Sequence, residues 1–414
     1  MTRSNAFIRG LERAAMTVVS GAIGYRMKFG TGPAEPSGPQ RVLICKWCCL
    51  GDAVVSLYAI REFKNRNPAT IIDMLVSSRI AEVYRRATEI NEVHVLPLTG
   101  KRLVLELLKP TLWTRFFALI FRLRQAQYAQ FIDLELYRGT GPVLKRLIGI
   151  PFSRGFQVEG ALPKHHDFEV PLPRRMPEWQ CFYRVLGLDI PPAPPEALYR
   201  RESPSRQTQA GKIPTAPLAA TPIPAASSPI PPSPQGKRIG IVFGSSFNWP
   251  QKKWPWDNYA ELISLLSLDG HAFVLLGASD ETEEGARIAA RAAANVIDTT
   301  GQLDYAGLCR EVSACDLLIG NDTGTMHLAA AYGIPTVTLF GPTDPEKWNP
   351  LTSTPVFLAT VPCRPCYYLG SMPPCDHFSC LRKLEPSLVA ETVRGVLSGA
   401  NKSGQDEQIQ DGIR

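Results

Sequence analysis

The sequence predicts an α/β protein built from two doubly wound domains in tandem. The chain has 414 residues, short apolar segments alternate with longer segments of helical composition, and one proline-rich segment interrupts this pattern. A chain of this length exceeds what one hydrophobic core usually serves. Continuous apolar strands separated by helices are typical of parallel sheets that are covered on both faces.

Ten short segments are expected to form strands, and each half of the chain holds several of them. They are residues 41–45, 70–76, 93–96, 131–136, 238–243, 272–277, 295–298, 316–320, 336–340 and 355–358. Stretches of helical composition separate them, which predicts one doubly wound domain in each half. Ligands of such sheets bind at the carboxyl ends of the strands, so we expect the active site in a central cleft that the two domains face.

A proline-rich segment marks the boundary between the halves. Residues 191–234 contain 13 of the 37 prolines, together with Ala, Ser and Thr and almost no large apolar side chains. This composition cannot build a core and predicts an extended, mobile linker. The predicted organisation is a basic amphipathic segment at 1–37, a domain at 38–190, a linker at 191–236, a domain at 237–400 and a polar tail at 401–414.

Composition narrows the class of partner and the compartment. The hydrophobic fraction of 44% and the charged fraction of 20% are ordinary for a soluble globular protein. The net charge of +7 fits anionic small molecules or an anionic membrane surface better than nucleic acid. A chain this long does not need disulfides and begins with no evident secretory signal, so we expect ten reduced cysteines and a cytoplasmic protein.

The first 37 residues suggest a second, peripheral relation to the membrane. The apolar run at 14–25 is too short and too interrupted by glycine to span a bilayer. As a helix, the segment places apolar residues near helical spacing with arginines interleaved, and such a helix can lie on the inner face of an anionic membrane. A helix packed on its own domain, or a frayed end, is the alternative.

Residues 320–345 hold the densest pattern in the chain. The strand at 316–320 is followed by a turn at 321–324 and a short helix at 325–332. Gly333 suits a left-handed C-terminal cap, and Pro335 prevents the helix from continuing. A glycine-containing turn at a helix N-terminus presents backbone N–H groups and the positive end of the helix dipole, and both favour a diphosphate.

Individual residues of this pattern have simpler interpretations. Asp322 and Thr323 could serve only as N-caps of the helix. His327 taken alone is more typical of a satisfied helix histidine than of a ligand contact. The interpretation changes when the whole segment is considered.

The run D-T-G-x-x-H-L-A-A-A-x-G-x-P-x-V-x-L-F-G-P-T-x-P extends from Asp322 to Pro345 nearly without a gap. It resembles the signature of glycosyltransferase family nine, the heptosyltransferases of bacterial lipopolysaccharide core assembly. The resemblance implies the GT-B fold, with two Rossmann-like domains and a nucleotide-sugar bound mainly by the second. It also implies that Asp322, Thr323, Gly324 and His327 line the sugar and diphosphate of the donor.

A second segment fits the same family. After the strand at 238–243, the residues GSSFNWPQKKWP resemble the family's small-residue loop followed by K-x-W-P. Ser245 and Ser246 then occupy the loop, Lys252 occupies the matching lysine position, and Lys253 lies beside it. A lysine at the carboxyl edge of a strand can neutralise a leaving diphosphate. The alternative is that these lysines are merely solvated.

A third segment follows the first predicted strand. Its Leu50-Gly51-Asp52 is similar to the family's L-G-D element, in which the aspartate is the general base; by residue type alone it would be a turn and a cap. Two features depart from the family pattern: Tyr58 stands where a proline is usual, and residues 47–49 are bulky and thiol-rich. Both lie on the expected acceptor side, so they bear on the acceptor more than on the reaction.

The resemblance implies an inverting, metal-independent transfer of heptose from ADP-heptose to a lipopolysaccharide core or related glycolipid acceptor, without a cofactor. Asp52 would take the acceptor proton, and Lys252 would stabilise the leaving nucleotide. The residues by themselves support only a nucleotide diphospho-sugar donor. A non-catalytic carbohydrate- or nucleotide-binding protein on a GT-B scaffold is the alternative. A dehydrogenase is disfavoured, because no G-x-G-x-x-G follows the first strand of either half.

Four cysteines near the end of the chain leave one further alternative open. They are Cys363, Cys366, Cys375 and Cys380. Their spacing admits a four-thiolate zinc site, but reduced thiols in a loop are the favoured interpretation.

Overall fold

The structure, a computed structural model, describes the parts of the chain that form the two sheets and their helices. The described residues are 36, 38, 40–97, 109–136, 141–157, 166–199, 236–245, 249–292, 295–367 and 371–399. The predicted N-terminal segment except residue 36, the polar tail and residues 200–235 of the predicted linker lie outside this set.

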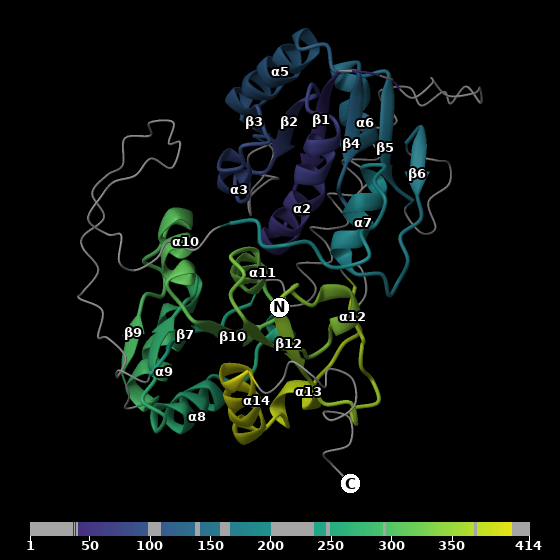
Figure 1. Cartoon of the computed structure of the whole chain (residues 1–414). Coiled ribbons are helices and arrows are strands. Elements are labelled where there is room, and N and C mark those ends of the chain that lie inside the picture. The colour runs from purple at the N-terminus through teal and green to yellow at the C-terminus, as the bar shows by residue number, and fades with distance from the viewer. Residues whose placement is uncertain are drawn as a thin grey trace. The chain divides into compact units, whose positions relative to one another are not determined.

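The chain divides into two compact units. The first comprises residues 1–48, 59–173 and 180–190, and the second comprises residues 49–58, 174–179 and 191–414. Each unit holds one six-stranded sheet (Figure 1). The prediction of two doubly wound α/β domains is therefore confirmed by the sheets themselves.

The first sheet has the strand order β3-β2-β1-β4-β5-β6, and all its neighbouring strands are parallel. Its strands are β1 (Arg41–Lys46), β2 (Ile71–Val76), β3 (Glu92–Val95), β4 (Gln130–Asp133), β5 (Phe152–Phe156) and β6 (Phe168–Val170). The helices along this half of the chain are α2 (Leu50–Arg66), α3 (Ala81–Arg85), α5 (Pro110–Gln125), α6 (Gly141–Ile148) and α7 (Glu178–Val185). One core joins β1, β2 and β4 to α5 and α6.

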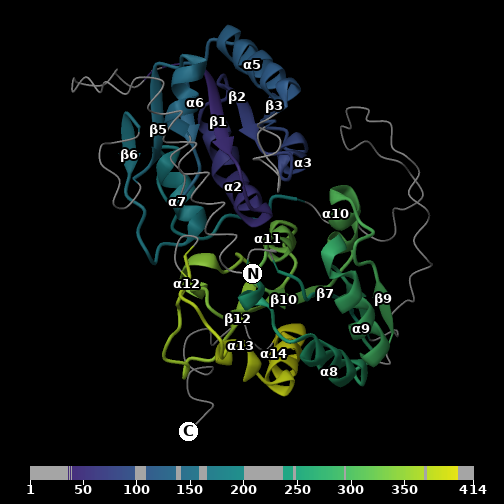
Figure 2. The same cartoon turned by 180° about the vertical axis from the view of Figure 1, so that it is seen from behind.

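The second sheet has the order β12-β11-β10-β7-β8-β9, again with all neighbours parallel. Its strands are β7 (Arg238–Val242), β8 (Ala272–Leu275), β9 (Val296–Asp298), β10 (Leu317–Asn321), β11 (Thr336–Leu339) and β12 (Ser353–Val356). Its helices are η2 (Pro250–Lys252), α8 (Trp256–Ser267), η3 (Ser279–Glu281), α9 (Thr282–Ala292), α10 (Tyr305–Ser313), α11 (Gly324–Ala331), α12 (Pro345–Trp348), α13 (Ser379–Arg382) and α14 (Pro386–Ser398). Figure 2 shows the same elements from behind.

Both sheets follow one connection rule. In each, the first strand lies in the middle, the next two strands extend to one side, and the last three extend to the other. The strand order therefore reverses between β1 and β4 in the first sheet and between β7 and β10 in the second. In doubly wound sheets such a reversal is the point where the connecting chains diverge and where ligands bind. These two places are called the first and the second switch point below.

Local sequence explains where several of these elements begin and end. The backbone of Gly333 has φ +67°, so the predicted left-handed cap of α11 is confirmed. Proline is the first residue of α5 and of α14, where its missing N–H costs no helical hydrogen bond. No helix in the described ranges combines the length and the apolar character needed to cross a membrane.

The ten predicted strands all exist, but β5 and β6 were not predicted. Their sequences, FSRGF and FEV, are short and mix charged or small residues with phenylalanine. The first residues of the predicted linker also differ from an extended segment. Leu198 is buried, and the Tyr199 N–H donates to the Ala331 carbonyl at the end of α11 over 2.9 Å. Leu198 and Tyr199 are large side chains of a kind that is rare in the rest of the proline-rich segment, which explains why this part packs.

Candidate functional site

The second switch point is formed by the segments that follow β7 and β10. Val242, the last residue of β7, pairs with Gly320 of β10, so the chain leaves both strands at the same edge. The predicted donor residues come from these two exits. Ser245 follows β7, and the turn with Asp322 and Thr323 follows β10.

A buried amide fastens the two exits to each other. The Asn321 Nδ2 group donates to the carbonyls of Phe243 at 2.7 Å and of Gly244 at 3.1 Å, while its Oδ1 accepts from the Trp254 N–H at 3.0 Å. Asn321 is fully buried, so these bonds are shielded from water. The loop after β7 is therefore held in a fixed place beside the N-terminus of α11.

Lys252 and Asp322 meet at this point. The Lys252 Nζ lies 2.9 Å from Asp322 Oδ2, and both side chains are largely buried. The ammonium also lies 5.0 Å from the centre of the Tyr367 ring, which packs edge-on against Trp249. An ammonium has three N–H groups, so the contact with Asp322 positions Lys252 and leaves donors for an anion.

The start of α11 is not closed by a side chain. Thr323 is the N-cap residue, yet its side chain makes no capping hydrogen bond, and Asp322 contacts Lys252 instead. The N-cap interpretation of both residues is therefore wrong. The Thr323 Oγ1 is buried without a hydrogen-bond partner within the described chain, and so is the Thr343 Oγ1 in the loop after β11. Buried hydroxyls in native proteins are normally satisfied, so a ligand at this edge would supply their partners.

His327 lies on α11, one turn after Gly324, and is buried. Burial lowers the pKa of His327 below its ordinary value, and the nearby charge of Asp322 opposes this effect only in part. The imidazole is therefore neutral at pH 7, which suits it to a hydrogen bond with a sugar or phosphate oxygen.

Lys253 points to a different group of charges from Lys252. Its Nζ lies 2.7 Å from Glu284 Oε2 and 3.3 Å from Glu281 Oε1. Burial acts to lower the pKa of Lys253, but the hydrogen bond with Glu284 and the two carboxylate charges raise it overall. Lys253 thus stays charged and is already engaged by two carboxylates.

Glu281 organises the loop after β7. Its carboxylate accepts from the Ser245 N–H at 3.0 Å and from the Ala278 N–H at 2.9 Å. A Cβ at Gly244 would come within 2.1 Å of this carboxylate, so a larger residue there would displace Glu281 from its hydrogen bonds. Ser245 Oγ donates to the Trp249 carbonyl, while Ser246 lies outside the described residues.

Asp52 lies in the first turn of α2, directly after the exit from β1. The helix begins at Leu50, so Asp52 is inside the turn and is not the N-cap residue. The preceding Cys49 has φ +70°, an uncommon backbone conformation for a residue with a Cβ. The Asp52 side chain is largely buried.

The rest of the first switch point is filled by a buried ion pair. Lys46, at the end of β1, lies 3.3 Å from Glu135 Oε1, and both side chains are fully buried. Glu135 follows β4 and also accepts from the Trp47 N–H at 2.8 Å. The two strand exits of the first switch point are therefore joined by the Lys46–Glu135 ion pair, whereas those of the second are joined by the Asn321 amide.

Asp133 adds a second buried carboxyl behind this pair. It accepts from the Glu135 N–H at 2.9 Å and from the Cys45 thiol at 3.2 Å, and its Oδ2 lies 3.6 Å from His166 Nε2. Burial raises the pKa of Asp133 to about 7, because desolvation disfavours the carboxylate more than the hydrogen bond from Glu135 favours it. Burial also raises the pKa of the Cys45 thiol, so it is inert as a nucleophile.

Two groups among the described residues could hold a metal ion by donor distance. The donor atoms of Cys48, Cys49 and Asp52 lie within 4.8 Å of one another, and so do those of Asp73, Glu92 and His94. In the second group the Asp73 carboxylate already accepts hydrogen bonds from Arg41, Asn91 and Tyr128, which leaves little for a metal. The four cysteines between residues 363 and 380 do not bring three donors this close within the part of the chain that is described.

Two doubly wound parallel sheets, one in each half of the chain, are the architecture of GT-B glycosyltransferases. A sequence model of Glycosyltransferase family 9 (heptosyltransferase) matches residues 116–372, more than half of the chain. The chain therefore belongs to glycosyltransferase family 9, the heptosyltransferase family, and the resemblance inferred from Asp322–Pro345 is confirmed.

Curated relatives and a solved structure support this placement. The chain is 29% identical over 173 residues to Lipooligosaccharide heptosyltransferase 2 of Campylobacter jejuni, covering 40% of this chain and 53% of the relative. It is 37% identical over 120 residues to Lipopolysaccharide heptosyltransferase 2 of Escherichia coli K12, covering 28% and 34%. These matches thus span about half and a third of the relatives' lengths. The fold is similar to that of "E. coli heptosyltransferase WaaC with ADP", with TM-score 0.61, 19% identity and coverage of 86% and 99%.

Sequence reasoning missed Glu281, Lys46 and Glu135. Glu281 follows β8 in the run GASDE, whose small residues at a strand exit were a usable signal. Lys46 directly follows the predicted strand at 41–45, and Glu135 lies within the predicted strand at 131–136. A charge beside or within an apolar run was the sign that they form a pair.

Proposed function

We propose that this chain transfers heptose from ADP-heptose to a lipopolysaccharide-core or related glycolipid acceptor, with inversion at the anomeric carbon and without a metal. The proposal places the reaction on the cytoplasmic side of the membrane that carries the acceptor. Family membership supports the reaction class, and the curated relatives are heptosyltransferases by name.

The observation that carries the donor assignment is the combination of Lys252 with the open start of α11. The ammonium of Lys252, the uncapped N-terminus at Thr323 and the two buried hydroxyls without partners all face one strand edge. Backbone N–H groups, a helix dipole and one cation are what a nucleoside diphosphate requires. A relative of the same fold was solved with ADP, which agrees with this assignment.

Asp52 is proposed as the general base. An acceptor hydroxyl would give its proton to the Asp52 carboxylate while its oxygen forms the new bond to the anomeric carbon. The bond between that carbon and the diphosphate breaks in the same step, and the electron pair leaves on ADP. Lys252 and the α11 N-terminus would then stabilise the charge that develops on the leaving group.

The proposed metal independence rests on Lys252 as the cation of the site. A thiophilic metal held by Cys48, Cys49 and Asp52 would occupy the carboxylate that the proposal assigns to the base. We therefore expect treatment with EDTA to leave turnover unchanged or to raise it. Loss of turnover on chelation, restored by one metal, would contradict metal independence.

The test of the whole proposal has two readouts on the full chain. Isothermal titration with ADP should show binding, and ADP release from ADP-heptose should depend on addition of a lipopolysaccharide-core acceptor. ADP binding without acceptor-dependent release would support the alternative of a non-catalytic nucleotide-binding protein on this scaffold. No binding of ADP would overturn the donor assignment.

A further inference from the structure

The segment that follows β12 brings an aromatic ring to the proposed donor site. Tyr367 lies at the end of this segment, immediately after Cys366 of the C-x-x-C pair. The centre of its ring is 5.0 Å from the Lys252 Nζ, and both residues belong to the second unit. Neither the motif segments described above nor the proposed mechanism gives this ring a role.

Backbone hydrogen bonds fix the place of the ring. The N–H groups of Cys366 and Tyr367 both donate to the Pro342 carbonyl at 3.0 Å, in the loop after β11. The Arg364 guanidinium donates to the Gly341 carbonyl of the same loop. Since β10 and β11 are parallel neighbours, this loop leaves the sheet at the same edge as the turn before α11. The segment that carries Tyr367 is therefore attached to the edge where the donor is proposed to bind.

Two tryptophans pack against the Tyr367 ring. Trp249 meets it edge to face with centroids 5.1 Å apart, and Trp348 does so with centroids 6.3 Å apart. Trp249 directly precedes η2, and Trp348 ends α12, so three separate segments of the chain meet at this ring. A ring that is held in this way loses little conformational entropy when it interacts with a charge.

Lys252 consequently has two attractive partners of different kinds. Its Nζ donates to Asp322 Oδ2 at 2.9 Å and stands over the face of the Tyr367 ring. The ring attracts the ammonium through its quadrupole but does not neutralise its charge. Only 15% of the Lys252 side chain is exposed, so water weakens this attraction little. The ammonium is held on two sides and stays available to an anion.

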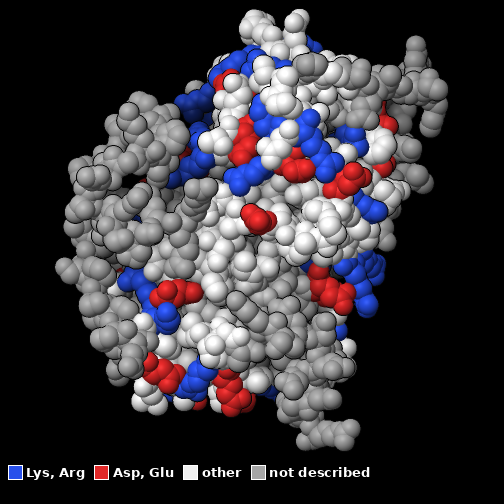
Figure 3. All heavy atoms as spheres, in the orientation of Figure 1, with Lys and Arg blue, Asp and Glu red and all other residues white. Residues whose placement is uncertain are grey.

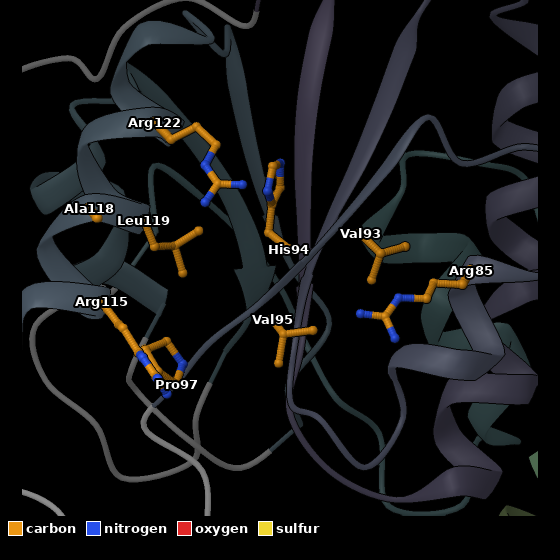
Figure 4. A pocket seen from close by; sticks show the side chains of 9 residues that line it. All are labelled: Arg85, Val93, His94, Val95, Pro97, Arg115, Ala118, Leu119 and Arg122. Atoms are coloured by element: carbon orange, nitrogen blue, oxygen red, sulfur yellow. The ribbon is translucent and has the colours of Figure 1, made fainter. Parts of the chain in front are cut away.

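Arginines of the first unit have the more usual partner, a carboxylate. Arg85 and Arg122 line a pocket of ≈ 360 Å³ (Figure 4), where Arg85 pairs with Glu82 and Arg122 lies 4.0 Å from Glu92. Figure 3 shows Lys and Arg beside Asp and Glu in several places on one face of the molecule. A carboxylate partner offsets the charge of the cation, whereas an aromatic partner preserves it. The ring therefore suits a lysine that has to bind a diphosphate.

We propose that Tyr367 is a positioning residue for Lys252. Its ring keeps the ammonium oriented toward the diphosphate of the donor, so the lysine does not have to reorganise when the nucleotide binds or departs. The inference rests on the proposed function, in which Lys252 stabilises the leaving nucleotide. It also gives the C-x-x-C segment a task, which is to carry this ring to the donor site.

The experiment combines ADP titration with steady-state turnover of the full chain. Tyr367→Phe keeps the ring, whereas Tyr367→Leu removes it and retains an apolar side chain. Both variants are made in wild type and in Lys252→Ala. A further series places phenylalanine with one, two or three fluorine atoms at position 367, because fluorine weakens the quadrupole of a ring at nearly constant shape. Phe168→Leu is the matched control, since that ring lies 4.4 Å from Arg154 in the first unit.

The ring variants should differ in a graded way. Tyr367→Phe should stay within about twofold of wild type in kcat/KM, and Tyr367→Leu should lose about tenfold and bind ADP more weakly. The fluorinated series should fall stepwise between these two variants. In Lys252→Ala, where the cation is absent, each change at position 367 should cost less than about twofold. Phe168→Leu should behave as wild type.

Two results overturn the inference while Lys252 keeps its proposed role. Equal losses for Tyr367→Leu with and without Lys252 would mean that the ring serves the fold and not the ammonium. A fluorinated series with constant kcat/KM and ADP affinity would exclude an effect on the charge, even if Tyr367→Leu fails to fold. A third result has a different meaning: wild-type turnover and ADP affinity in Lys252→Ala would remove Lys252 from the proposed function, and the inference with it.

Discussion

The two switch points have the same strand topology, but different kinds of side chain join their strand exits. In the second, a neutral amide of Asn321 joins the strand exits, and glycine keeps the loop after β7 small. In the first, the fully buried pair of Lys46 and Glu135 joins the exits, with Asp133 behind it. The first is therefore filled by its own charges, whereas the second keeps Lys252 and the N-terminus of α11 at its edge.

This difference indicates how the same strand topology can support two tasks, donor binding and placement of the base. A site for a diphosphate needs donors that are fixed before the ligand arrives, and in the proposed donor site Asn321 meets that need by holding the loop after β7 beside the N-terminus of α11. The first switch point uses its ionic contacts to position the segment that leads into α2, because Glu135 accepts from the N–H of Trp47. Asp52 follows a few residues later. We infer that binding depends mainly on the second switch point, and base placement on the first.

The largest expected effect comes from replacing Asp52. Asp52→Asn keeps the size of the side chain but cannot accept the acceptor proton, so kcat should fall by roughly two to four orders of magnitude. ADP affinity and thermal stability should stay near wild type, because Lys252 and the N-terminus of α11, which are proposed to hold the diphosphate, are unchanged. Steady-state turnover and ADP titration measure both quantities.

The matched control for this variant is Asp189→Asn. Asp189 is a surface aspartate whose side chain is 97% exposed. It should keep normal turnover. If Asp52→Asn keeps normal turnover like this control, Asp52 is only part of a helix turn. The first switch point would then have no acid–base role.

The sequence was sufficient to predict the strands because their burial shows directly in the residues. β1 and β10 consist mainly of apolar residues. Gly333 predicted the end of α11, because glycine adopts the left-handed conformation of a helix cap more easily than other residues. β5 escaped prediction because FSRGF places an arginine and a glycine in a strand whose five residues are all buried. The burial of these residues depends on contacts with elements that are distant in sequence, and the local sequence does not specify those contacts.

The site was predictable only where a motif carried it. Asp322 and Lys252 stood in family-like segments, but their 2.9 Å contact joins two residues that are 70 positions apart in sequence and follow different strands. Lys253 sits beside Lys252 in sequence and yet contacts Glu281 and Glu284. Adjacent residues point to different places because η2 ends between them, and this geometry is not encoded in residue type.

The next effect concerns stability and the charge pair of the first switch point. Lys46→Met leaves the Glu135 carboxylate buried without its cation and should lower the free energy of unfolding by about 3–5 kcal/mol. The double variant Lys46→Met with Glu135→Gln should recover part of this loss, since a neutral amide still accepts from the Trp47 N–H. Urea unfolding of the single and double variants measures the coupling.

An exposed pair supplies the reference for that cycle. Arg394 and Asp269 lie 2.8 Å apart with side chains 45% and 35% exposed, so Arg394→Met should cost less than about 1 kcal/mol. An equally small loss for Lys46→Met would mean that the first switch point is not held by its ion pair.

A smaller effect separates the two neighbouring lysines of the second switch point. Lys252→Ala removes the cation beside Asp322 and should lower kcat by about two to three orders of magnitude, in line with the loss of one group that stabilises a developing charge. Lys253→Ala should change kcat only a few-fold, because Lys253 is engaged by Glu281 and Glu284. Equal losses of kcat in the two variants would show that the two lysines act together as one cationic patch. The contact with Asp322 would then give Lys252 no separate role.

The last prediction tests the first switch point through pH. The pKa of Asp133 is about 7 in the folded protein, against an ordinary value of 3.8, because the carboxyl is buried. Between these two pH values the folded state holds a proton that the unfolded state has released, so stability falls as pH rises through this window. Asp133→Asn has no such proton but still accepts from the Glu135 N–H. The difference in unfolding free energy between wild type and Asp133→Asn should therefore decline from about pH 4 to about pH 7, by at most ~1.4 kcal/mol per pH unit, and stay level outside it. Chemical unfolding across this range, with Asp189→Asn as reference, measures the slope. Parallel curves for wild type and Asp133→Asn would show that Asp133 ionises normally, and that the first switch point is wetter and less closed than its buried charges indicate.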